Sequence, residues 1–348
     1  AGPKGAPMTT LMFQEIGEAG DAVARLLGHN AELLAELGAR LRALDPPLVA
    51  TIARGSSDCC ALYLKYLVEI VSGVPCASIG PSIATLYRVP MRLQGAVSVA
   101  ISQSGRSPDI VEMQRAARRG GALAVALVNE VASPLAKEAE ALLPLCAGPE
   151  RSVAATKSMI AGLVAGASLV AAWREDRPLA DAIAGLPDIL RGQTAPPPAA
   201  MLERLASARS AFVLGRGATL AIAAEAALKL KETCAIHAEA YSAAEVLHGP
   251  AELVNPGFPV IAFLPSDAAR EGMLATLARL ADAGATVIVI EAGGADDANR
   301  LAAAKVEATL LEPVVMIDRF YRLAEALALR LGRDPDRPRN LRKVTETV

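Results

Sequence analysis

One pattern that occurs twice constrains the fold of this chain more than any other feature: a short apolar run, a glycine, and then a helical stretch. The first copy is LVATIARGSSDCCALYLKYLVEIV, which breaks at Gly55, and the second is SAFVLGRGATLAIAAEAALKLKETC, which breaks at Gly217. The Arg-Gly pair recurs at 54–55 and 216–217, an offset of 162 (216 − 54) that matches the length of one domain. The sequence therefore predicts two similar domains in tandem.

Other apolar runs follow the first strand of each half. GAVSVAIS, ALAVALV and ALLPLCA lie in the first half, and PVIAFL and GATVIVIEA lie in the second. Helical patterns separate them, such as PDIVEMQRAARRG, which places Ser107 as its N-cap and Pro108 at its first helical position. Apolar runs without alternation, separated by helices, are typical of parallel sheets covered on both faces. The predicted fold class is α/β, with two tandem three-layer α/β/α domains and parallel sheets.

Composition shifts divide the chain into segments. The stretch RGQTAPPPAAM is typical of a linker because it is rich in proline and lacks an apolar period. We expect a helical lead-in, a first domain, a linker, a second domain and a C-terminal tail, with these bounds: 1–47, 48–190, 191–203, 204–334 and 335–348. The opening AGPKGAP is unlike anything that follows, so residues 1–7 are expected to be an addition ahead of a native start at Met8.

The composition limits the partners and the compartment. The 348 residues carry a formal net charge of −2 and a pI of about 6.1, which argues against nucleic acid or an anionic membrane as a partner. The most apolar run, MIAGLVAGASLVAAW, is too short to span a bilayer and is predicted to be a buried core helix. Five cysteines without metal-ligand spacing favour a reducing cytoplasm, with no disulfide framework and no metal site.

Two serine-rich loops of the first domain are candidates for an anion site. GSS at 55–57 and SQSGRS at 102–107 each follow a predicted strand, and ligands bind beyond the carboxyl ends of the strands in parallel sheets. With N–H groups at two helix starts, the polar side chains could cradle a phosphate; they are Ser56, Ser57, Ser102, Gln103, Ser104 and Ser107. The alternative is that each serine is only an N-cap or turn residue. Two such loops in one sheet favour the anion site, although the sequence has neither a P-loop nor a Rossmann glycine motif.

An acid–base cluster is the second candidate site. Glu225, Lys229 and Glu232 are spaced i, i+4 and i+7, so one helix face carries all three, although an exposed face with a Glu–Lys pair would look the same. The following segment HAEAYSAAEVLHGP favours catalysis, because it adds further carboxylates and places His248 at a turn. A carboxylate beside a lysine, with a histidine in reach, is suited to moving protons along a sugar carbon chain. His237 is expected to be structural.

The C-terminal segment RPRNLRKVTETV admits two interpretations. A basic, polar end is usually a frayed terminus. Pro338 and Asn340 suggest a fixed turn instead, which would allow Lys343 to enter a pocket. The residues alone leave both interpretations open.

Four stretches in order, ISQSGRSPD, EAALKLKE, IHAEAYSAAEVLHGP and DRPRNL with the Arg-Lys pair after it, resemble the sugar isomerase (SIS) family. The resemblance covers almost the whole chain and is strongest to the isomerase half of glucosamine-6-phosphate synthase and to SIS-type glucosamine-6-phosphate deaminases. It implies phosphate contacts at Ser57, Ser102, Gln103, Ser104 and Ser107. It also implies sugar contacts at Gly55, Ser56, Val153 and Arg342.

The same resemblance implies roles for the acid–base cluster and the tail. Glu232 would shuttle the proton, supported by Glu225 and Lys229. His248 would open the sugar ring in the active site of a partner subunit, which implies a homodimer. Lys343 would meet the open-chain sugar, and no metal or redox cofactor is implied.

Three residues depart from the synthase pattern and bear on which substrate is bound. Arg54 occupies the position of a cysteine, Arg106 that of an acidic residue, and Ala155 that of a hydroxyl residue. If Met8 is the native start, no glutaminase segment precedes the sugar domains. The expected reaction is therefore D-glucosamine 6-phosphate plus water giving D-fructose 6-phosphate and ammonia. The alternatives are the isomerase half of a synthase, galactosamine-6-phosphate deaminase, fructosamine-6-phosphate deglycase and a non-catalytic sugar-phosphate sensor. The sensor is disfavoured, because the acid–base set is present and no basic helix-turn-helix segment precedes residue 48.

Overall fold

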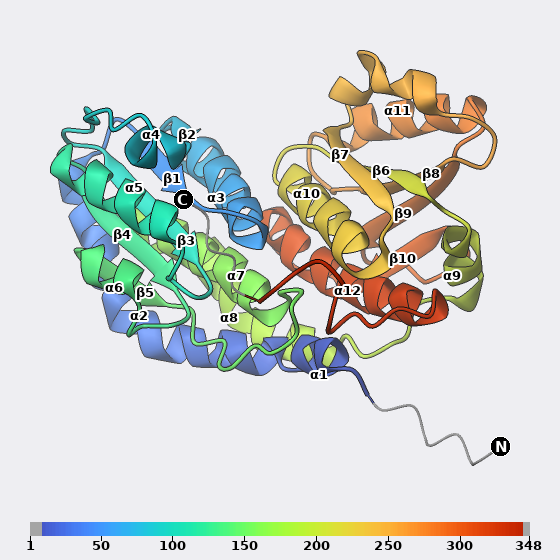
Figure 1. Ribbon diagram of the computed structural model, residues 1–348, viewed down its shortest axis with the longest axis horizontal. Helices are drawn as coiled ribbons and strands as arrows, with labels where there is room; N and C mark the ends of the chain where they lie inside the picture. Colours follow the sequence, from blue (N-terminus) through green and yellow to red (C-terminus); the bar gives the residue numbers. More distant parts are fainter. Residues whose placement is uncertain (1–8, 344–348) are drawn as a thin grey trace.

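Each half of the chain folds around its own parallel sheet. The computed structural model describes residues 9–343 and shows two five-stranded sheets, each flanked by helices (Figure 1). All neighbouring strands are parallel. This confirms the predicted fold class of two tandem α/β/α domains.

The lead-in and the first half contain the following helices and strands: α1 (Leu11–Gly17), α2 (Ala19–Leu44), β1 (Val49–Ile52), α3 (Ser56–Ser72), β2 (Cys76–Ser78), α4 (Ser82–Thr85), β3 (Val97–Ser102), α5 (Pro108–Arg119), β4 (Leu123–Val128), α6 (Pro134–Glu138), β5 (Ala141–Pro144), α7 (Lys157–Arg174) and α8 (Arg177–Gly192). The second half contains α9 (Ala199–Ala206), β6 (Ser210–Gly215), α10 (Thr219–Lys229), η1 (Leu230–Cys234), β7 (His237–Ser242), η2 (Glu245–Leu247), η3 (Pro250–Leu253), β8 (Pro259–Phe263), α11 (Arg270–Asp282), β9 (Thr286–Ala292), β10 (Arg300–Ala303), η4 (Thr309–Leu311) and α12 (Glu312–Arg330).

Both sheets share one strand order. The first sheet runs β2-β1-β3-β4-β5, and the second, read from its other edge, runs β7-β6-β8-β9-β10. The first strand of each half therefore pairs with the second strand on one side and with the third strand on the other. The loops that follow β1 and β3, and those that follow β6 and β8, meet at a switch point, which is where open parallel sheets bind ligands.

Three strands that the sequence pattern does not predict all lie at sheet edges: β2, β7 and β10. β2 has only 3 residues, two of them exposed, and β7 has exposed charged residues in alternation, beginning at His237. An edge strand is paired on one side only and does not need a continuous apolar run. The acid–base segment after α10 therefore begins as a strand.

The predicted core helix is confirmed as α7, which is buried along almost its whole length and packs against α2 and α3. Its small residues permit this close packing, because a Cβ added at Gly162 would lie only 2.7 Å from Cys60 Sγ. None of the described helices is both long and apolar enough to cross a membrane.

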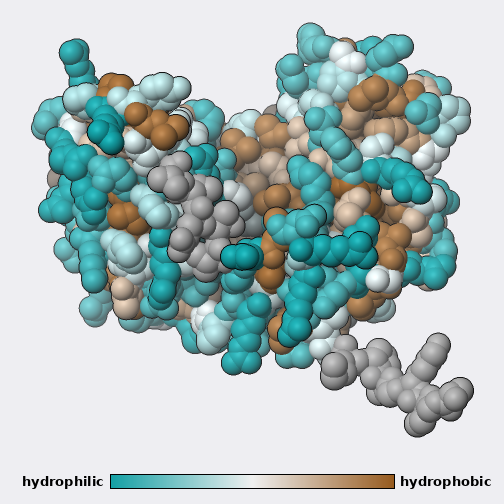
Figure 2. Space-filling model, in the orientation of Figure 1, coloured by the Kyte–Doolittle hydropathy of each residue, from teal (hydrophilic) through white to brown (hydrophobic). Residues whose placement is uncertain are grey.

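The junction between the two domains is built from helices that start near the switch points. α3 of the first domain packs against α10 of the second, and α10 is supported from within its own domain by α12 (Figure 1). Figure 2 shows the domains as two lobes with a recess between them, and apolar side chains lie at its base. Side chains from both domains are therefore brought together at this junction.

Candidate active site

A single hydrogen bond joins the two predicted sites. Ser56, in the first turn of α3, donates from Oγ to Glu225 Oε1 of α10 at 3.2 Å. Since α3 begins directly after the loop that follows β1, this contact places a carboxylate of the second domain against an anion loop of the first. The acid–base cluster and the predicted anion cradle are thus neighbours, although 169 residues separate the two side chains.

Glu225, Lys229 and Glu232 form a continuous row of charges. Lys229 Nζ lies 3.4 Å from Glu225 Oε1 and is also hydrogen-bonded to Glu232 Oε2. The side chains of Lys229 and Glu225 are 1% and 0% exposed, whereas that of Glu232 is 19% exposed. Glu232 is therefore the member of the row that a substrate can reach, and the other two support it from the interior.

A wide helical turn brings Glu232 to Lys229. α10 ends at Lys229, and η1 is a π-helical turn closed by Ala235, whose φ is 52°. π-helical turns are rare and frequently lie at functional sites. The regular i, i+4, i+7 spacing predicts one shared face, and Glu232 in the π-helical turn is in direct contact with Lys229.

Burial sets the electrostatics of this row. It raises the pKa of the Glu225 carboxyl to about 7, against the opposing effect of the Lys229 ammonium. Burial by itself would lower the pKa of Lys229, but the carboxylates of Glu225 and Glu232 outweigh it and raise that pKa. Lys229 is therefore a cation at neutral pH, hydrogen-bonded to the side chain proposed as the general base.

Sequence reasoning missed Tyr321 of α12. Its hydroxyl donates to Glu225 Oε1 at 2.9 Å, the same oxygen that accepts from Ser56. Burial raises the pKa of this phenol far above its ordinary value, so it remains a donor. Glu225 Oε2 is buried without a hydrogen-bond partner among the described residues. No local pattern signals Tyr321, because α12 has the apolar period of an ordinary core helix.

The anion loops meet at the switch point of the first sheet, since β1 and β3 are hydrogen-bonded neighbours. Gly55, with φ 56°, turns the chain into α3. Within the described residues, the side chains of Ser57, Gln103 and Ser107 form no hydrogen bond and are half-buried. Three of the predicted phosphate contacts are therefore available to a ligand.

The other two predicted phosphate contacts help to shape their loop. Ser102 Oγ accepts from the Gly105 N–H at 3.0 Å, and Ser104 Oγ accepts from the Arg106 N–H at 3.3 Å. Gly105 adopts φ 61°, and a Cβ there would lie 2.1 Å from Ser133 Oγ. The loop is thus held in one tight conformation, with Ser102 buried and Ser104 half-buried.

Arg54, one of the departures from the synthase pattern, ties the two anion loops together. Its Nε lies 3.1 Å from Asp109 Oδ2, and Asp109 stands in the first turn of α5. Arg54 directly precedes Gly55, so the ion pair links the loop after β1 to the helix after β3. Arg106, another of the departures, is exposed in the loop after β3.

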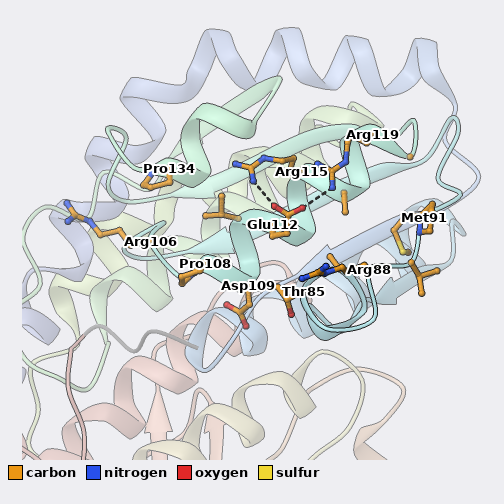
Figure 3. Close-up of a pocket in the computed structure, with 16 residues that line it drawn as sticks. Thr85, Arg88, Met91, Arg106, Pro108, Asp109, Glu112, Arg115, Arg119 and Pro134 are labelled. Carbon is orange, nitrogen blue, oxygen red and sulfur yellow. Dashed lines mark hydrogen bonds and ion pairs between the residues drawn. The ribbon is translucent and has the colours of Figure 1, made fainter. Parts of the chain in front are cut away.

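A cavity of about 920 Å³ lies next to the cradle, between α4 and α5. Figure 3 shows Arg115 and Arg119 on the two sides of Glu112, with ion pairs of 2.6 and 2.8 Å. Arg88 also lines the cavity. The cavity meets the cradle at its Arg106 end and is lined by none of the acid–base residues. It therefore adjoins the candidate reaction centre and does not contain it.

The C-terminal tail is docked on the first domain as far as Lys343. The Lys343 ammonium donates to the carbonyl of Ser152 at 2.7 Å and to Glu150 Oε2 at 3.1 Å. The N–H of Val153, in the same loop, donates to the carbonyl of Asp336 at 3.3 Å. Two predicted sugar contacts, Val153 and the exposed Arg342, thus lie near Lys343 in this structure.

Glu150 is a second residue that sequence reasoning missed. Its side chain is 0% exposed and accepts from the N–H groups of Thr156 and Ser158 at 3.0 and 3.1 Å. Although burial favours the neutral acid, Lys343 and these donors hold the pKa of Glu150 below its ordinary value. An ionised Glu150 is therefore the counter-charge that fixes the tail lysine.

His248 stands apart from the acid–base cluster. It is exposed and follows η2, and its N–H donates to the carbonyl of Glu245 at 2.9 Å. No hydrogen bond or ion pair within residues 9–343 joins its ring to Glu232 or to the anion loops. One copy of the chain therefore does not bring the predicted ring-opening histidine into the candidate site.

All five cysteines are free thiols. In the part of the chain that the structure describes, no three His, Cys, Asp or Glu side chains are grouped to hold a metal ion.

The chain is similar to known proteins over most of its length. The model of the SIS domain family matches residues 47–172 and 204–318. Glutamine–fructose-6-phosphate aminotransferase (isomerizing) of Thermus thermophilus is 34% identical over 95% of this chain and 58% of that protein. The protein of the same name from Aeropyrum pernix is 37% identical over 93% of this chain and 55% of its own length. The chain thus spans little more than half of these relatives.

Solved structures extend the comparison to the fold. A Silicibacter pomeroyi protein described as a phosphosugar isomerase superposes with a TM-score of 0.88 at 46% identity, covering 94% of this chain and 100% of that one. The C-terminal domain of glucosamine-fructose-6-phosphate aminotransferase from Francisella tularensis gives a TM-score of 0.80 at 26% identity, covering 97% and 100%. The two matched segments of the family model coincide with the two sheets. This chain belongs to the SIS domain family.

Proposed function

We propose that the protein is an isomerase and deaminase of amino-sugar phosphates, which converts D-glucosamine 6-phosphate and water to D-fructose 6-phosphate and ammonia. The observation that carries the proposal is the hydrogen bond from Ser56 to Glu225, because it sets a buried acid–base row beside an anion loop. The relatives named for fructose 6-phosphate support the substrate class. Homodimer formation belongs to the same proposal.

The substrate phosphate binds at the switch point of the first sheet. Its oxygens accept from the N–H groups at the starts of α3 and α5 and from the polar side chains of both anion loops; these are Ser57, Ser102, Gln103, Ser104 and Ser107. Gly55, Ser56, Val153 and Arg342 contact the sugar. The partner subunit supplies its copy of the exposed histidine of the η2–η3 loop, and that imidazole opens the pyranose to the aldehyde.

Proton transfer follows ring opening. The Glu232 carboxylate removes the proton from C2 and returns it to C1, while the oxygen at C1 gains a proton and the amine nitrogen loses one, so that the amino aldehyde becomes a 2-imine with an alcohol at C1. Lys229 stabilises the carboxylate from behind, and Lys343 meets the oxygen at C1. Water then adds to C2, ammonia leaves, and the ketone of fructose 6-phosphate remains.

Release of ammonia and fructose 6-phosphate from glucosamine 6-phosphate tests the reaction and the base together. Glu232→Gln keeps the shape of the side chain but cannot accept a proton, so we expect turnover to fall by at least about 10²-fold. Lys231→Gln is the matched control, because Lys231 is exposed in the same turn, and it is expected to retain turnover. Equal activity of Glu232→Gln and the wild type would remove Glu232 from the proposed role.

Subunit mixing tests the shared histidine. His248→Ala and Glu232→Gln homodimers are both expected to be inactive, because each lacks one group at every site. Co-refolded mixed dimers have one site with both groups and should regain up to about half of the wild-type activity per dimer. Mixed dimers that stay inactive, with dimer formation verified by light scattering, would place the histidine outside the partner's site.

The alternative functions are separated in the same assay. Galactosamine 6-phosphate, fructosamine 6-phosphate, and fructose 6-phosphate with ammonia are offered in place of glucosamine 6-phosphate. Turnover of one of these with the same dependence on Glu232 would change the substrate and keep the residues. Binding of sugar phosphates without turnover of any would favour a sensor.

A further inference from the structure

The second sheet has a switch point built like the anion cradle of the first. β3 begins at Val97 and β8 at Pro259, an offset of 162 (259 − 97), which equals the offset between the two Arg-Gly pairs. At this same offset Ser104, a predicted phosphate contact, corresponds to Ser266 (266 − 104). Gly217 also repeats the left-handed turn of the first domain, with φ 60°. The second domain therefore has the parts of an oxyanion site.

In the second domain this place is filled by a side chain of the protein itself. The Ser266 N–H donates to Glu312 Oε2 at 2.9 Å, and the Ser266 hydroxyl is hydrogen-bonded to Glu312 Oε1. Glu312 is the first residue of α12 and is only 4% exposed. A guanidinium lies beside the same loop, because Arg270 donates to the carbonyl of Pro265 at 3.3 Å. Both carboxylate oxygens thus meet donors that could equally hold two oxygens of a phosphate.

We propose that the second domain retains an oxyanion seat, formed by the Ser266 N–H and hydroxyl in the loop 264–270, and that the Glu312 carboxylate occupies it as an internal ligand. The ligand class of the vacated seat is inorganic phosphate or a phosphate monoester. Its identity as a phosphate seat rests on the function proposed for the first cradle. Because Glu312 fills the oxyanion seat of the second domain, only the cradle of the first domain remains open to a sugar phosphate, although the two domains are repeats.

Phosphate binding to a variant without the carboxylate tests the seat directly. Glu312→Ala and Glu312→Asp remove or withdraw the carboxylate, and bound inorganic phosphate is counted by equilibrium dialysis at constant ionic strength. We expect each variant to bind one more phosphate per chain than the wild type. Glu307→Ala, which removes an exposed carboxylate before α12, is expected to bind as many as the wild type.

The same measurement in a Ser104→Ala protein distinguishes failure of this proposal from failure of the proposed function. Ser104→Ala weakens the first cradle, so the comparison of Ser104→Ala with Ser104→Ala/Glu312→Ala isolates the second seat. A gain of one phosphate there supports the seat even where the first cradle binds none. Folded Glu312 variants that gain no phosphate overturn the proposal.

Stability gives an independent readout, because a ligand that binds only the folded state raises the Tm. Phosphate should raise the Tm of Glu312→Ala more than that of the wild type or of Glu307→Ala. If both Glu312 variants fail to fold in chloride, folding that returns in phosphate supports the seat. Failure to fold in either buffer means that phosphate does not replace the carboxylate, and it overturns the proposal.

Discussion

Lys229 lies where an isolated charge would not be stable. Its ammonium is shielded from water between two carboxylates, and its inner partner Glu225 is fully buried. Removal of one member of a buried ion pair leaves an uncompensated charge and typically costs about 3–5 kcal/mol. The acid–base row therefore contributes to the stability of the domain junction as well as to the candidate chemistry.

Replacement of Lys229 should destabilise the protein in a pH-dependent way. Burial raises the pKa of Glu225 to about 7, and loss of the ammonium removes the group that opposes this rise. A carboxyl with a raised folded-state pKa favours folding at low pH and opposes it as the pH rises through that value. We expect Lys229→Met to lower the free energy of unfolding by about 3–5 kcal/mol at pH 8 and by clearly less at pH 5.

Urea denaturation at the two pH values measures this difference, with Lys231→Met as the control for loss of a charge from the same turn. An equal loss of stability at pH 5 and pH 8 would show that the protonation of Glu225 does not depend on the Lys229 ammonium.

The sequence predicts the members of the row but not the side chains that fix it. Glu225, Lys229 and Glu232 are close in the chain, and helix geometry brings such neighbours to one face. Tyr321 and Ser56 contact Glu225 across 96 and 169 residues. Residue spacing carries no information about pairs so far apart, so these two contacts could be found only from the fold.

At the scale of elements, the loop after β3 depends on a glycine for two separate reasons. Gly105 has φ 61°. A Cβ added at this residue would lie only 2.1 Å from Ser133 Oγ and 2.9 Å from Val128 Cγ2. Gly217, after β6, has nearly the same φ of 60° but nothing within 4 Å of an added Cβ. A comparison of alanine substitutions at the two glycines therefore distinguishes the cost of backbone strain from the cost of steric collision.

Gly105→Ala is expected to destabilise the protein more than Gly217→Ala. Both alanines bear the left-handed conformation, at about 1–2 kcal/mol, and only the first also overpacks its surroundings, at about 1–3 kcal/mol more. Thermal unfolding of both variants, with phosphate affinity measured on each, checks this. Equal losses of Tm in the two variants would mean that the side chains of Ser133 and Val128 rearrange to accommodate the added methyl group.

The predicted strands share one physical property: they are apolar enough to be recognised locally. The inner strands of both sheets are continuous apolar runs, because helices cover both of their faces. The edge strand β7 presents His237 and Glu239 to solvent, so its sequence has the composition of a loop. Its pairing with β6 is decided by the neighbouring strand and not by its own residues.

At the scale of the whole molecule, the tail connects the helical lead-in to the first domain. Asp336 accepts from the N–H groups of Leu11 and Met12 at 2.7 and 2.8 Å and so caps α1. Its own carbonyl accepts from the Val153 N–H, in the loop that also holds Lys343. Asp336 therefore fixes the path of the tail before Lys343 reaches Glu150.

Asp336→Ala should uncap α1 and release the tail together. Loss of a cap costs about 1 kcal/mol, which lowers the Tm by about 2–4 °C in a single domain of roughly 150–250 residues. The variant is also expected to have a lower kcat than the wild type, because Lys343 loses its fixed position. Arg339→Ala is the control, since Arg339 is exposed on the same tail segment. An unchanged kcat with the expected loss of Tm would separate the cap from catalysis.

The bond between Asp336 and Leu11 joins residues 325 positions apart, and this separation bears on how the protein is synthesised. Domains fold as units while the chain leaves the ribosome, beginning with the N-terminal one. The first N–H groups of α1 must wait for residue 336 to emerge, and the loop of Glu150 must wait for Lys343. Between the emergence of β10, which ends at Ala303, and that of residue 336, the nascent chain can hold both sheets without the docked tail. A chain that ends before residue 336 would contain both sheets and the acid–base row but would lack the docked Lys343.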